Sequence, residues 1–429
     1  MRDAGRIAAA LDVLAQFEAR RVPIKVCLAD WARGARYAGA KDRAFIGGVV
    51  HDALRYRRSL ELDTRPRIGI GRVLMTLWGW PEARLVEAFA ETPHGPGALS
   101  AEEIDAIAEG ATLAARDVRR DWPEFALPLL ERVNDNPTAE IEANRARAPV
   151  DLRVNTLRSD LPRTEKALRG EGAVPAPLAA LALRCAVPAA ERRGPAIEIT
   201  PAFQKGWVEI QDEGSQLAAL AMGDLAGGQI LDFCAGAGGK TLAMAAHLDN
   251  RGQVFAYDID ARRLAPLYDR ARRAGVRNVQ VLSPTSDAAR LGDLTGKMDG
   301  VFVDAPCSGA GTWRRRPDTK WRLTPDQLAT RQEEQDRVLD QAEAFVRPGG
   351  ILVYVTCSIF AEENEDRIAA FLDRHPTYDI EDPGAAITAS GGVHAGAVLP
   401  PADGRGTLRL SPAKTATDGF AITRLRRRG

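Results

Sequence analysis

Cysteine is scarce in this 429-residue chain, and no two of its five cysteines form a C-x-x-C pair. A disulfide framework or a zinc site needs paired or closely spaced cysteines, so the sequence predicts neither and favours a reducing, cytoplasmic setting. We expect no metal ligands. The cysteines are Cys27, Cys185, Cys234, Cys307 and Cys357.

Long apolar runs and an excess of one charge are also missing. No stretch approaches the ~18 apolar residues of a membrane-spanning helix, and no apolar segment follows residues 1–6 as it would in a signal peptide. Lysine plus arginine and aspartate plus glutamate each number 58, so the formal net charge is zero. We therefore expect no membrane partner and a monomer, with any nucleic acid held by local basic patches.

The N-terminal third has the residue spacing of helices. Ile7, Ala10, Leu14 and Phe17 recur at helical intervals, and prolines separate such runs. We predict an all-helical domain over residues 1–135. A polar–apolar alternation at 151–156 and a short helical pattern at 164–168 then predict a small α+β connector over 136–208.

From residue 209 to 429, short apolar runs alternate with helical patterns. This order predicts an α/β domain with a doubly wound parallel sheet, covered by helices on both faces. Ligands of such sheets bind outside the carboxyl ends of the strands, so the residues after each run matter most. The runs lie at 230–231, 254–257, 279–282, 301–303 and 351–355.

A glycine-rich loop, residues 234–240, follows the first run. Glycine lets the backbone approach a ligand, and the helix behind it offers free N–H groups. A phosphate-binding P-loop would need glycine where Cys234 stands, and a dinucleotide motif would need glycine where Thr241 stands. A plain tight turn between strand and helix also explains the glycines.

Asp258 ends the second run, 20 residues after Gly238. An acid at this distance accepts hydrogen bonds from a ribose diol, which an ATP-binding P-loop does not need. A nucleoside cofactor without a phosphate cradle is therefore favoured, and S-adenosylmethionine fits. The apolar run that ends in Asp304 also resembles a Walker B strand, so an NTPase stays as an alternative that Cys234 disfavours.

Two cysteines follow the fourth and fifth runs, Cys307 in Asp304-Ala-Pro-Cys and Cys357 in Thr-Cys-Ser. Either one alone could be a small buried apolar residue, but two at the mouth of a cofactor cleft indicate chemistry. A thiolate that adds to C6 of a pyrimidine makes the unreactive C5 nucleophilic. Asp304 is placed to stabilise the adduct at ring N3. The residues alone leave open which cysteine attacks.

Several motifs together resemble the Sun/Fmu-type (RsmB/NOP/Sun) RNA cytosine-5 methyltransferases. The resemblance covers about residues 149–425 and includes the 234–240 loop. The helical region, through residues 42–45 and 54–58, resembles a NusB-like RNA-binding domain. The other motifs are Asp-Ala-Pro-Cys-Ser-Gly at 304–309, Arg-Pro-Asp-Thr-Lys-Trp at 316–321, Thr-Cys-Ser at 356–358 and Glu-Glu-Asn-Glu at 362–365.

The resemblance implies a Rossmann-like class I methyltransferase domain with Cys357 as the nucleophile and Cys307 assisting release of the enzyme. It also places Lys240 and Asp304 among the catalytic residues. The expected substrate is RNA, of the 16S type; a tRNA methyltransferase and a non-catalytic RNA-binding assembly factor stay as alternatives. The residues expected around S-adenosylmethionine are Cys234, Ala235, Gly236, Ala237, Gly238, Gly239, Lys240, Asp258 and Asp304.

Two positions depart from the family pattern. Residues 236–237 are Gly-Ala where the family usually has Ala-Pro, and the third strand lacks the acid that the family commonly shows near the adenine. We expect Asp287 to serve as that acid through a short insertion. Basic residues after the Cys307 motif are expected to line the RNA entrance, although such runs are often only solvated surface: Arg314, Arg315, Arg316, Lys320 and Arg322.

Overall fold

The chain forms two compact units in a computed structural model that describes residues 1–110, 117–191 and 194–429. The first unit contains Met1–Ala148, Val187–Gly194 and Trp313–Leu323, and the second contains the remaining segments. Two short segments of the C-terminal two-thirds of the chain therefore belong to the first unit.

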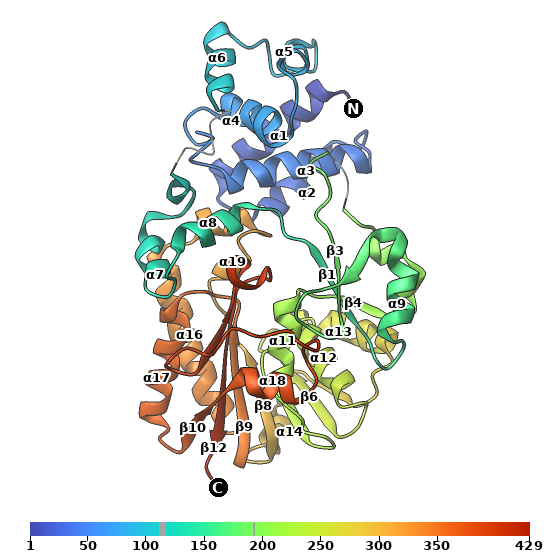
Figure 1. Ribbon diagram of the computed structural model, residues 1–429, viewed down its shortest axis with the longest axis vertical. Coiled ribbons are helices and arrows are strands. Elements are labelled where there is room, and N and C mark those ends of the chain that lie inside the picture. Colours follow the sequence, from blue (N-terminus) through green and yellow to red (C-terminus); the bar gives the residue numbers. More distant parts are fainter. Residues whose placement is uncertain (111–116, 192–193) are drawn as a thin grey trace. The chain divides into compact units, whose positions relative to one another are not determined.

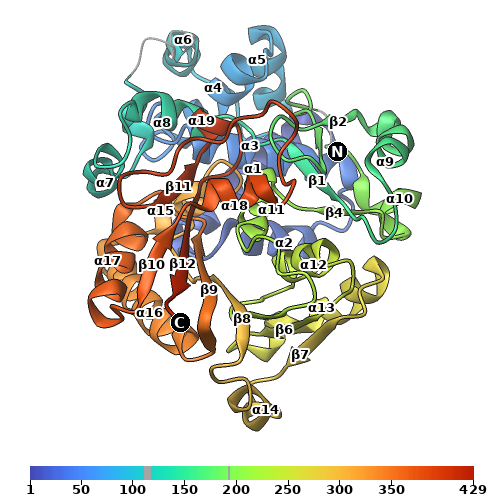
Figure 2. The ribbon, with the colours of Figure 1, turned by 60° about the horizontal axis from the view of Figure 1, so that its bottom comes forward.

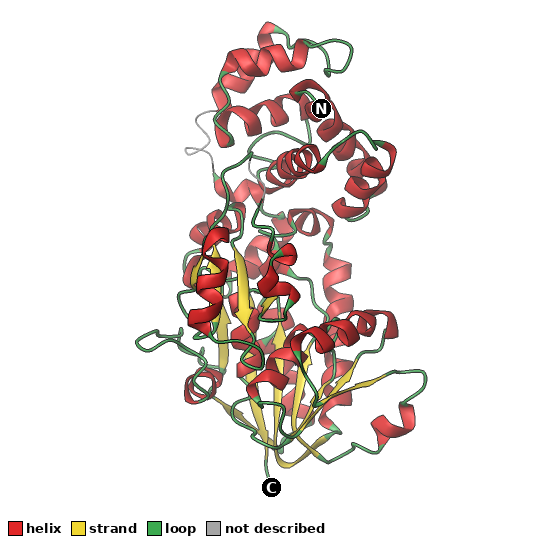
Figure 3. Cartoon of the chain, turned by 90° about the vertical axis from the view of Figure 1, so that its right-hand side faces the viewer, coloured by secondary structure: helices red, strands yellow, loops and turns green. Residues whose placement is uncertain are grey.

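The described part of the first unit consists of helices and turns and has no strand (Figure 3), which confirms the helical prediction for the N-terminal region. Pro66 is the first residue of its helix, while Pro23 and Pro81 directly precede theirs, positions where no backbone N–H is needed. The helices are α1 (Asp3–Arg20), α2 (Ile24–Gly34), α3 (Ala40–Arg55), α4 (Pro66–Arg72), α5 (Glu82–Ala90), α6 (Ala101–Glu109), α7 (Leu127–Glu131), α8 (Pro137–Arg145) and α15 (Pro317–Arg322).

The core of the first unit is built by the periodic apolar residues. Ile7, Val13 and Phe17 lie on one side of α1 and are almost fully buried, as are Phe45 and Val49 of α3. Helix α8 extends this helical unit beyond residue 135, to Ala148.

The second unit begins with a small antiparallel sheet in the order β2-β3-β1-β4. The alternating residues near 151 form its central strand β1, and the short predicted helix is α9. The elements are β1 (Val150–Val154), α9 (Leu161–Leu168), β2 (Ala173–Pro175), β3 (Ala182–Cys185), α10 (Pro201–Gln204) and β4 (Val208–Ile210).

The main sheet of the second unit has the order β10-β12-β9-β8-β5-β6-β7, with β11 paired to β12 (Figures 1 and 2). Strands β5 to β9 are parallel, and β10, β11 and β12 join in antiparallel fashion. The strands are β5 (Gln229–Asp232), β6 (Gln253–Tyr257), β7 (Val279–Leu282), β8 (Met298–Asp304), β9 (Val346–Thr356), β10 (Tyr378–Glu381), β11 (Thr407–Leu410) and β12 (Phe420–Arg427).

Alternate residues of each central strand enter different apolar cores. Phe302 of β8 and Val353 of β9 belong to one cluster, and their neighbours Val301 and Leu352 belong to the other. Burial of both faces is why these strands read as continuous apolar runs. The covering helices are α11 (Glu213–Leu220), α12 (Gly239–His247), α13 (Ala261–Ala274), α14 (Ala288–Gly292), α16 (Pro325–Glu343), α17 (Glu365–Arg374), α18 (Pro383–Ala389) and α19 (Pro412–Thr415).

The strand order reverses between β5 and β8, because β6 and β7 follow β5 on one side while β9 follows β8 on the other. Such a reversal opens a crevice at the carboxyl ends of the two strands. The doubly wound prediction is thus confirmed, and the five predicted apolar runs are β5 to β9.

Candidate active site

The glycine-rich loop joins β5 to α12 at the point of reversal. Gly236 and Gly238 have φ angles of +51° and +82°, a region that favours glycine. A Cβ on Gly238 would come within 2.2 Å of Leu267 Cδ1, so a larger residue there would displace the buried Leu267 side chain as well as strain the backbone. The loop therefore turns sharply and directs the N-terminal N–H groups of α12 toward the crevice.

Asp258 lies directly after β6 and is 1% exposed. Its carboxylate accepts hydrogen bonds from the backbone N–H groups of Gly236 and Asp260, each at 3.0 Å, and pairs with Arg263 Nη1 at 3.0 Å. Asp258, the predicted acceptor for the ribose, thus also holds the glycine loop in place through its hydrogen bond from Gly236. The half-exposed Arg263 is the outermost of these three partners.

Asp232, which the sequence interpretation did not single out, ends β5 below the loop. Thr241 Oγ1 donates to its Oδ2 at 2.6 Å, and its other oxygen is buried without a partner. Burial raises the pKa of Asp232 to about 7. Its position at a carboxyl strand end was the available signal, since that edge holds the ligands of this fold.

Asp304 and Lys240 form an ion pair at the end of β8. Lys240 Nζ lies 2.6 Å from Asp304 Oδ2, and the Asp304 side chain keeps 34% of its surface exposed. Burial alone would lower the pKa of Lys240, but the adjacent carboxylate outweighs it and the pKa is raised. Lys240 therefore stays charged and holds a partly open carboxylate in place.

The two predicted cysteines meet at the same sheet edge. Cys307 follows β8 and Cys357 follows β9, and these strands are parallel neighbours. Their Sγ atoms lie 3.4 Å apart. The hydrogen bond to Cys357, together with burial, raises the pKa of Cys307 well above its ordinary value. Cys307 therefore keeps its proton, and either sulfur can be the donor in this contact.

Glu363 fastens the two cysteine loops to each other. It accepts from the backbone N–H of Ser308 at 2.7 Å and from the Ser308 hydroxyl, and that hydroxyl lies 3.3 Å from Ser358 Oγ. Gln335 of α16 donates to Glu363 at 3.1 Å and to the Pro306 carbonyl at 2.9 Å. Burial raises the pKa of Glu363, and the surrounding donors oppose that effect.

Asn364 shapes the Cys357 loop from the next position. Its Nδ2 donates to the carbonyls of Ser358 and Phe360, at 3.2 and 2.7 Å, and its Oδ1 accepts from Thr356 Oγ1 at 2.7 Å. The Glu-Glu-Asn-Glu motif thus acts through the backbone and side chains of both loops. Neither contact was predicted from the sequence.

Cys234 and Asp287 lie apart from the thiols. Burial raises the pKa of Cys234 well above its ordinary value, so this thiol stays protonated beside the loop. Asp287 directly precedes α14, makes no side-chain capping bond to it, and accepts from Ser283 N–H at 3.0 Å and from Ser286 Oγ at 2.9 Å. These bonds lower its pKa. A role of Asp287 near the adenine stays a prediction.

The basic residues expected at the RNA entrance all fall in the Trp313–Leu323 segment of the first unit. Arg314 and Lys320 are buried, at 5% and 2% exposure, so their side chains do not present charge to solvent. Burial lowers the pKa of Lys320 to about 7. Such positions do not fit RNA contacts by these two residues, and the prediction is kept for Arg315, Arg316 and Arg322.

We compared the chain with known protein families and proteins. The model of the 16S rRNA methyltransferase RsmB/F family matches residues 219–426. A "Ribosomal RNA small subunit methyltransferase B" from Sodalis glossinidius is 35% identical, covering 90% of both chains. The chain belongs to the RsmB/F family. Another protein of that name, from Klebsiella pneumoniae, is 32% identical over 80% of this chain and 84% of its own length.

Solved structures share the fold of this RsmB/F-family chain. PH0851 superposes with a TM-score of 0.72 over 99% of both chains, at 22% identity. A methyltransferase homolog from Pyrococcus horikoshii gives 0.56 at 27% identity, over 71% of this chain and 99% of that one. NSun6 from the same organism, solved with SFG, gives 0.60 at 22% identity over 71% and 98%.

These results make the chain an S-adenosylmethionine-dependent RNA methyltransferase with a class I α/β domain. The residues present fit the cofactor: the crevice has a loop with two glycines at positive φ, a helix N-terminus and a buried Asp232 oxygen that has no hydrogen-bond partner. In the described residues no helix is long and apolar enough to cross a membrane, and no cluster of three potential metal ligands occurs.

Asp258→Ala should weaken S-adenosylmethionine binding by ~1.5–3 kcal/mol, because it removes a charged acceptor from the ribose position and releases the loop N–H. Isothermal titration calorimetry measures this change. Arg263→Ala, which removes only the half-exposed partner of Asp258, is the matched control and should bind nearly as wild type. Wild-type affinity in Asp258→Ala would exclude this residue from the cofactor site.

Glu363→Gln should lower the methylation rate about 10- to 100-fold, since hydrogen bonds to a charged group contribute ~1.5–3 kcal/mol. The amide would present a donor where Ser308 also donates. Cofactor affinity should stay within about twofold, because Glu363 contacts neither the glycine loop nor Asp258. Glu333→Gln, at an exposed position of α16, supplies the control; equal rates in the two variants would contradict a role in joining the loops.

Proposed function

We propose that this protein transfers a methyl group to C5 of a cytosine in small-subunit ribosomal RNA through a covalent bond between Cys357 and C6. The observation that carries the proposal is the pair of sulfur atoms 3.4 Å apart, next to the Lys240–Asp304 ion pair. A methyl acceptor that is already nucleophilic, such as an amine, needs no thiol. An unactivated ring carbon does.

The reaction requires only a methyl donor from the cofactor. S-adenosylmethionine, when bound, supplies an electrophilic methyl group on a sulfonium. The loop residues Gly236 to Gly239, with Asp232 and Asp258, would hold it at the carboxyl ends of β5 and β6. Thr241 keeps Asp232 oriented through its hydroxyl.

The nucleophilic form of a thiol is its thiolate, so Cys357 must lose its proton to water before it adds to C6. The Cys307 S–H donates to the thiolate, and a hydrogen bond donated to a sulfur anion stabilises that anion. As the Cys357 S–C6 bond forms, the electrons of the C5–C6 double bond move through the ring to N3. N3 takes a proton from the Lys240 ammonium by way of Asp304, which leaves Lys240 as the neutral amine. Asp304 is partly exposed, so its free oxygen can hold that proton at N3. C5 is then nucleophilic.

Release reverses these changes once C5 carries the methyl group. The C5 proton passes to water, the C5–C6 double bond re-forms, the S–C6 bond breaks and the N3 proton returns to the Lys240–Asp304 pair. Cys357 departs as a thiolate and regains the hydrogen bond from Cys307. Because Cys307 keeps its proton, its S–H stabilises the negative charge that returns to the Cys357 sulfur.

The two thiols should therefore fail differently when replaced. Cys357→Ala should abolish methylation and form no adduct. Cys307→Ala should still attack and methylate but release slowly, so a protein–RNA adduct should accumulate with S-adenosylmethionine and survive denaturing electrophoresis. The Cys307→Ala/Cys357→Ala double variant, which cannot take the first step, is the control for non-covalent association.

Opposite behaviour of the two variants would reverse the assigned roles. An adduct with Cys357→Ala and none with Cys307→Ala would make Cys307 the nucleophile. Full methylation by both single variants would remove the covalent mechanism and leave another site on the RNA as the methyl acceptor.

Ribosomal RNA is favoured over tRNA because the relatives that match 80–90% of this chain are named small-subunit ribosomal RNA methyltransferases. Bisulfite sequencing of total RNA from cells with and without the gene should show one protein-dependent 5-methylcytosine in 16S-type RNA. Restoration by the wild-type protein but not by Cys357→Ala is expected. A protein-dependent signal confined to tRNA would overturn this substrate.

A further inference from the structure

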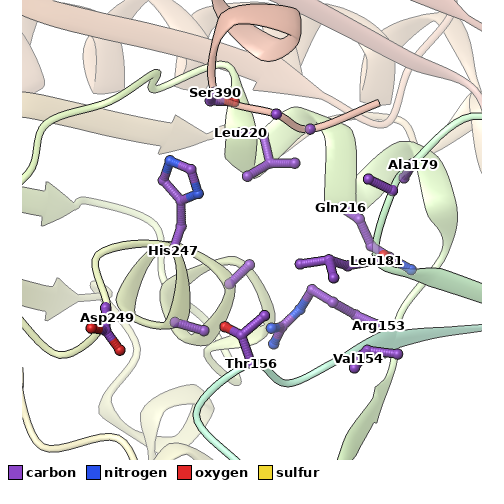
Figure 4. A pocket seen from close by; sticks show the side chains of 15 residues that line it. Arg153, Val154, Thr156, Ala179, Leu181, Gln216, Leu220, His247, Asp249 and Ser390 are labelled. Carbon is purple, nitrogen blue, oxygen red and sulfur yellow. The ribbon is translucent and has the colours of Figure 1, made fainter. Parts of the chain in front are cut away.

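A cavity lies in the second unit, and no residue of the glycine-rich loop lines it. Its volume is about 300 Å³, and it is enclosed by β1, the segment before β3, helices α11 and α12 and the end of α18 (Figure 4). Helix α12 begins at the glycine loop but contributes residues from its other half, Ala243, Ala246 and His247, to this cavity. None of the lining residues belongs to the active site described above.

Arg153 is the distinctive residue of the cavity. It is 6% exposed, and its guanidinium extends into the cavity in Figure 4. Its Nε donates to the neutral Gln211 Oε1 at 2.8 Å. Among the described residues no carboxylate forms an ion pair with it. Burial lowers the pKa of Arg153 to about 10, so it still carries its charge at neutral pH.

The missing counter-ion has a structural reason. Glu209 is the residue paired with Arg153 across β1 and β4, but its carboxylate is occupied by Arg270 at 3.0 Å and by Arg273. A buried charge without a partner is costly. The two terminal nitrogens of Arg153 thus offer a planar fork of donors, which matches the geometry of a carboxylate or phosphate group.

The remaining walls select among anions. Leu181, Leu220 and the two α12 alanines make much of the lining apolar. Burial lowers the pKa of His247, so this ring is neutral at pH 7 and adds no second cation. Asp249, which is largely exposed, pairs with Arg251 at 3.3 Å, so this part of the lining offers the cavity no cation. One guanidinium balances one negative charge, so a monoanion with an apolar body fits better than a dianionic phosphate.

We propose that this cavity is a binding site for a small monocarboxylate with an apolar body, held through its carboxylate by Arg153. The site is separate from the proposed reaction, because binding can be measured without RNA or methyl transfer. Failure of either proposal therefore leaves the other intact.

Three probes of similar shape and different charge test the site by isothermal titration calorimetry on the full chain at pH 8: benzoate, benzamide and phenyl phosphate. Benzoate should bind, and benzamide, which lacks the charge, should bind about 10- to 100-fold more weakly, the factor for hydrogen bonds to a charged group. Phenyl phosphate, a dianion at this pH, should also bind more weakly than benzoate.

Two variants place the binding in the cavity. Arg153→Gln should weaken benzoate binding about 10- to 100-fold, and Ala246→Leu should abolish it by filling the cavity without touching the guanidinium. Ala289→Leu, at an exposed position of α14, is the control for the added side chain. S-adenosylmethionine binding by each variant verifies the fold of the second unit, and Ala246→Leu decides the test if Arg153→Gln does not fold.

Three results would overturn the proposal. They are no benzoate binding by the wild-type chain, benzoate binding that Ala246→Leu leaves unchanged, and Arg153-dependent binding of phenyl phosphate that is tighter than that of benzoate. The last result would assign the cavity to phosphate esters instead.

Discussion

The parallel pairing of β8 with β9 is the constraint on which the active site depends. Asp304 lies opposite Val355 in this ladder, so the loops that follow the two strands start side by side. Cys307 and Cys357 are 50 residues apart in sequence, yet their sulfur atoms lie in contact because each follows its strand by a few residues. Glu363 then connects the Cys307 loop to the Cys357 loop through Ser308. The sheet thus sets the approximate distance between the two sulfur atoms, and the buried Glu363 carboxylate sets the final distance.

Several buried carboxylates lie near the carboxyl ends of the strands, and each has a different set of cations and hydrogen-bond donors around it. Asp232 has one hydroxyl partner and a pKa raised to about 7, whereas Asp258 has two backbone donors and an arginine. Glu365 is paired with Arg409, but burial still raises its pKa to about 7. Desolvation disfavours the ionised form, and only nearby cations and donors restore it. Burial therefore raises the pKa of Asp232 and of Glu365 even though each has a partner.

The segment after the Cys307 loop connects the two units along the chain. Residues up to Thr312 belong to the second unit, and Trp313–Leu323 belongs to the first. There the Arg55 guanidinium donates to the Arg314 carbonyl at 2.7 and 2.9 Å, and Trp321 Nε1 donates to the Leu54 carbonyl at 2.6 Å. The arginine-rich motif is thus partly a structural anchor in the helical unit. The sequence suggested either RNA contact or a solvated basic surface for this motif.

The sequence by itself determined the α/β class, the five parallel strands and the residues at their carboxyl ends, because a strand buried on both faces is a continuous apolar run and its end is marked by the first polar residue. Apolar spacing likewise predicted α1. The C-terminal strands β10 to β12 were not predicted, because charged residues such as Asp379, Arg409 and Arg424 interrupt their apolar residues and leave no continuous apolar run.

Only the tertiary structure decided which of these residues meet. The distance between the two sulfurs, the role of Glu363 and the burial of Arg314 and Lys320 depend on contacts between segments tens or hundreds of residues apart. The unpaired charge of Arg153 has the same origin, because it exists only where α13 brings two other arginines to Glu209. Residue type and spacing indicate which groups can react or bind, but charge, burial and partners are properties of the folded neighbourhood.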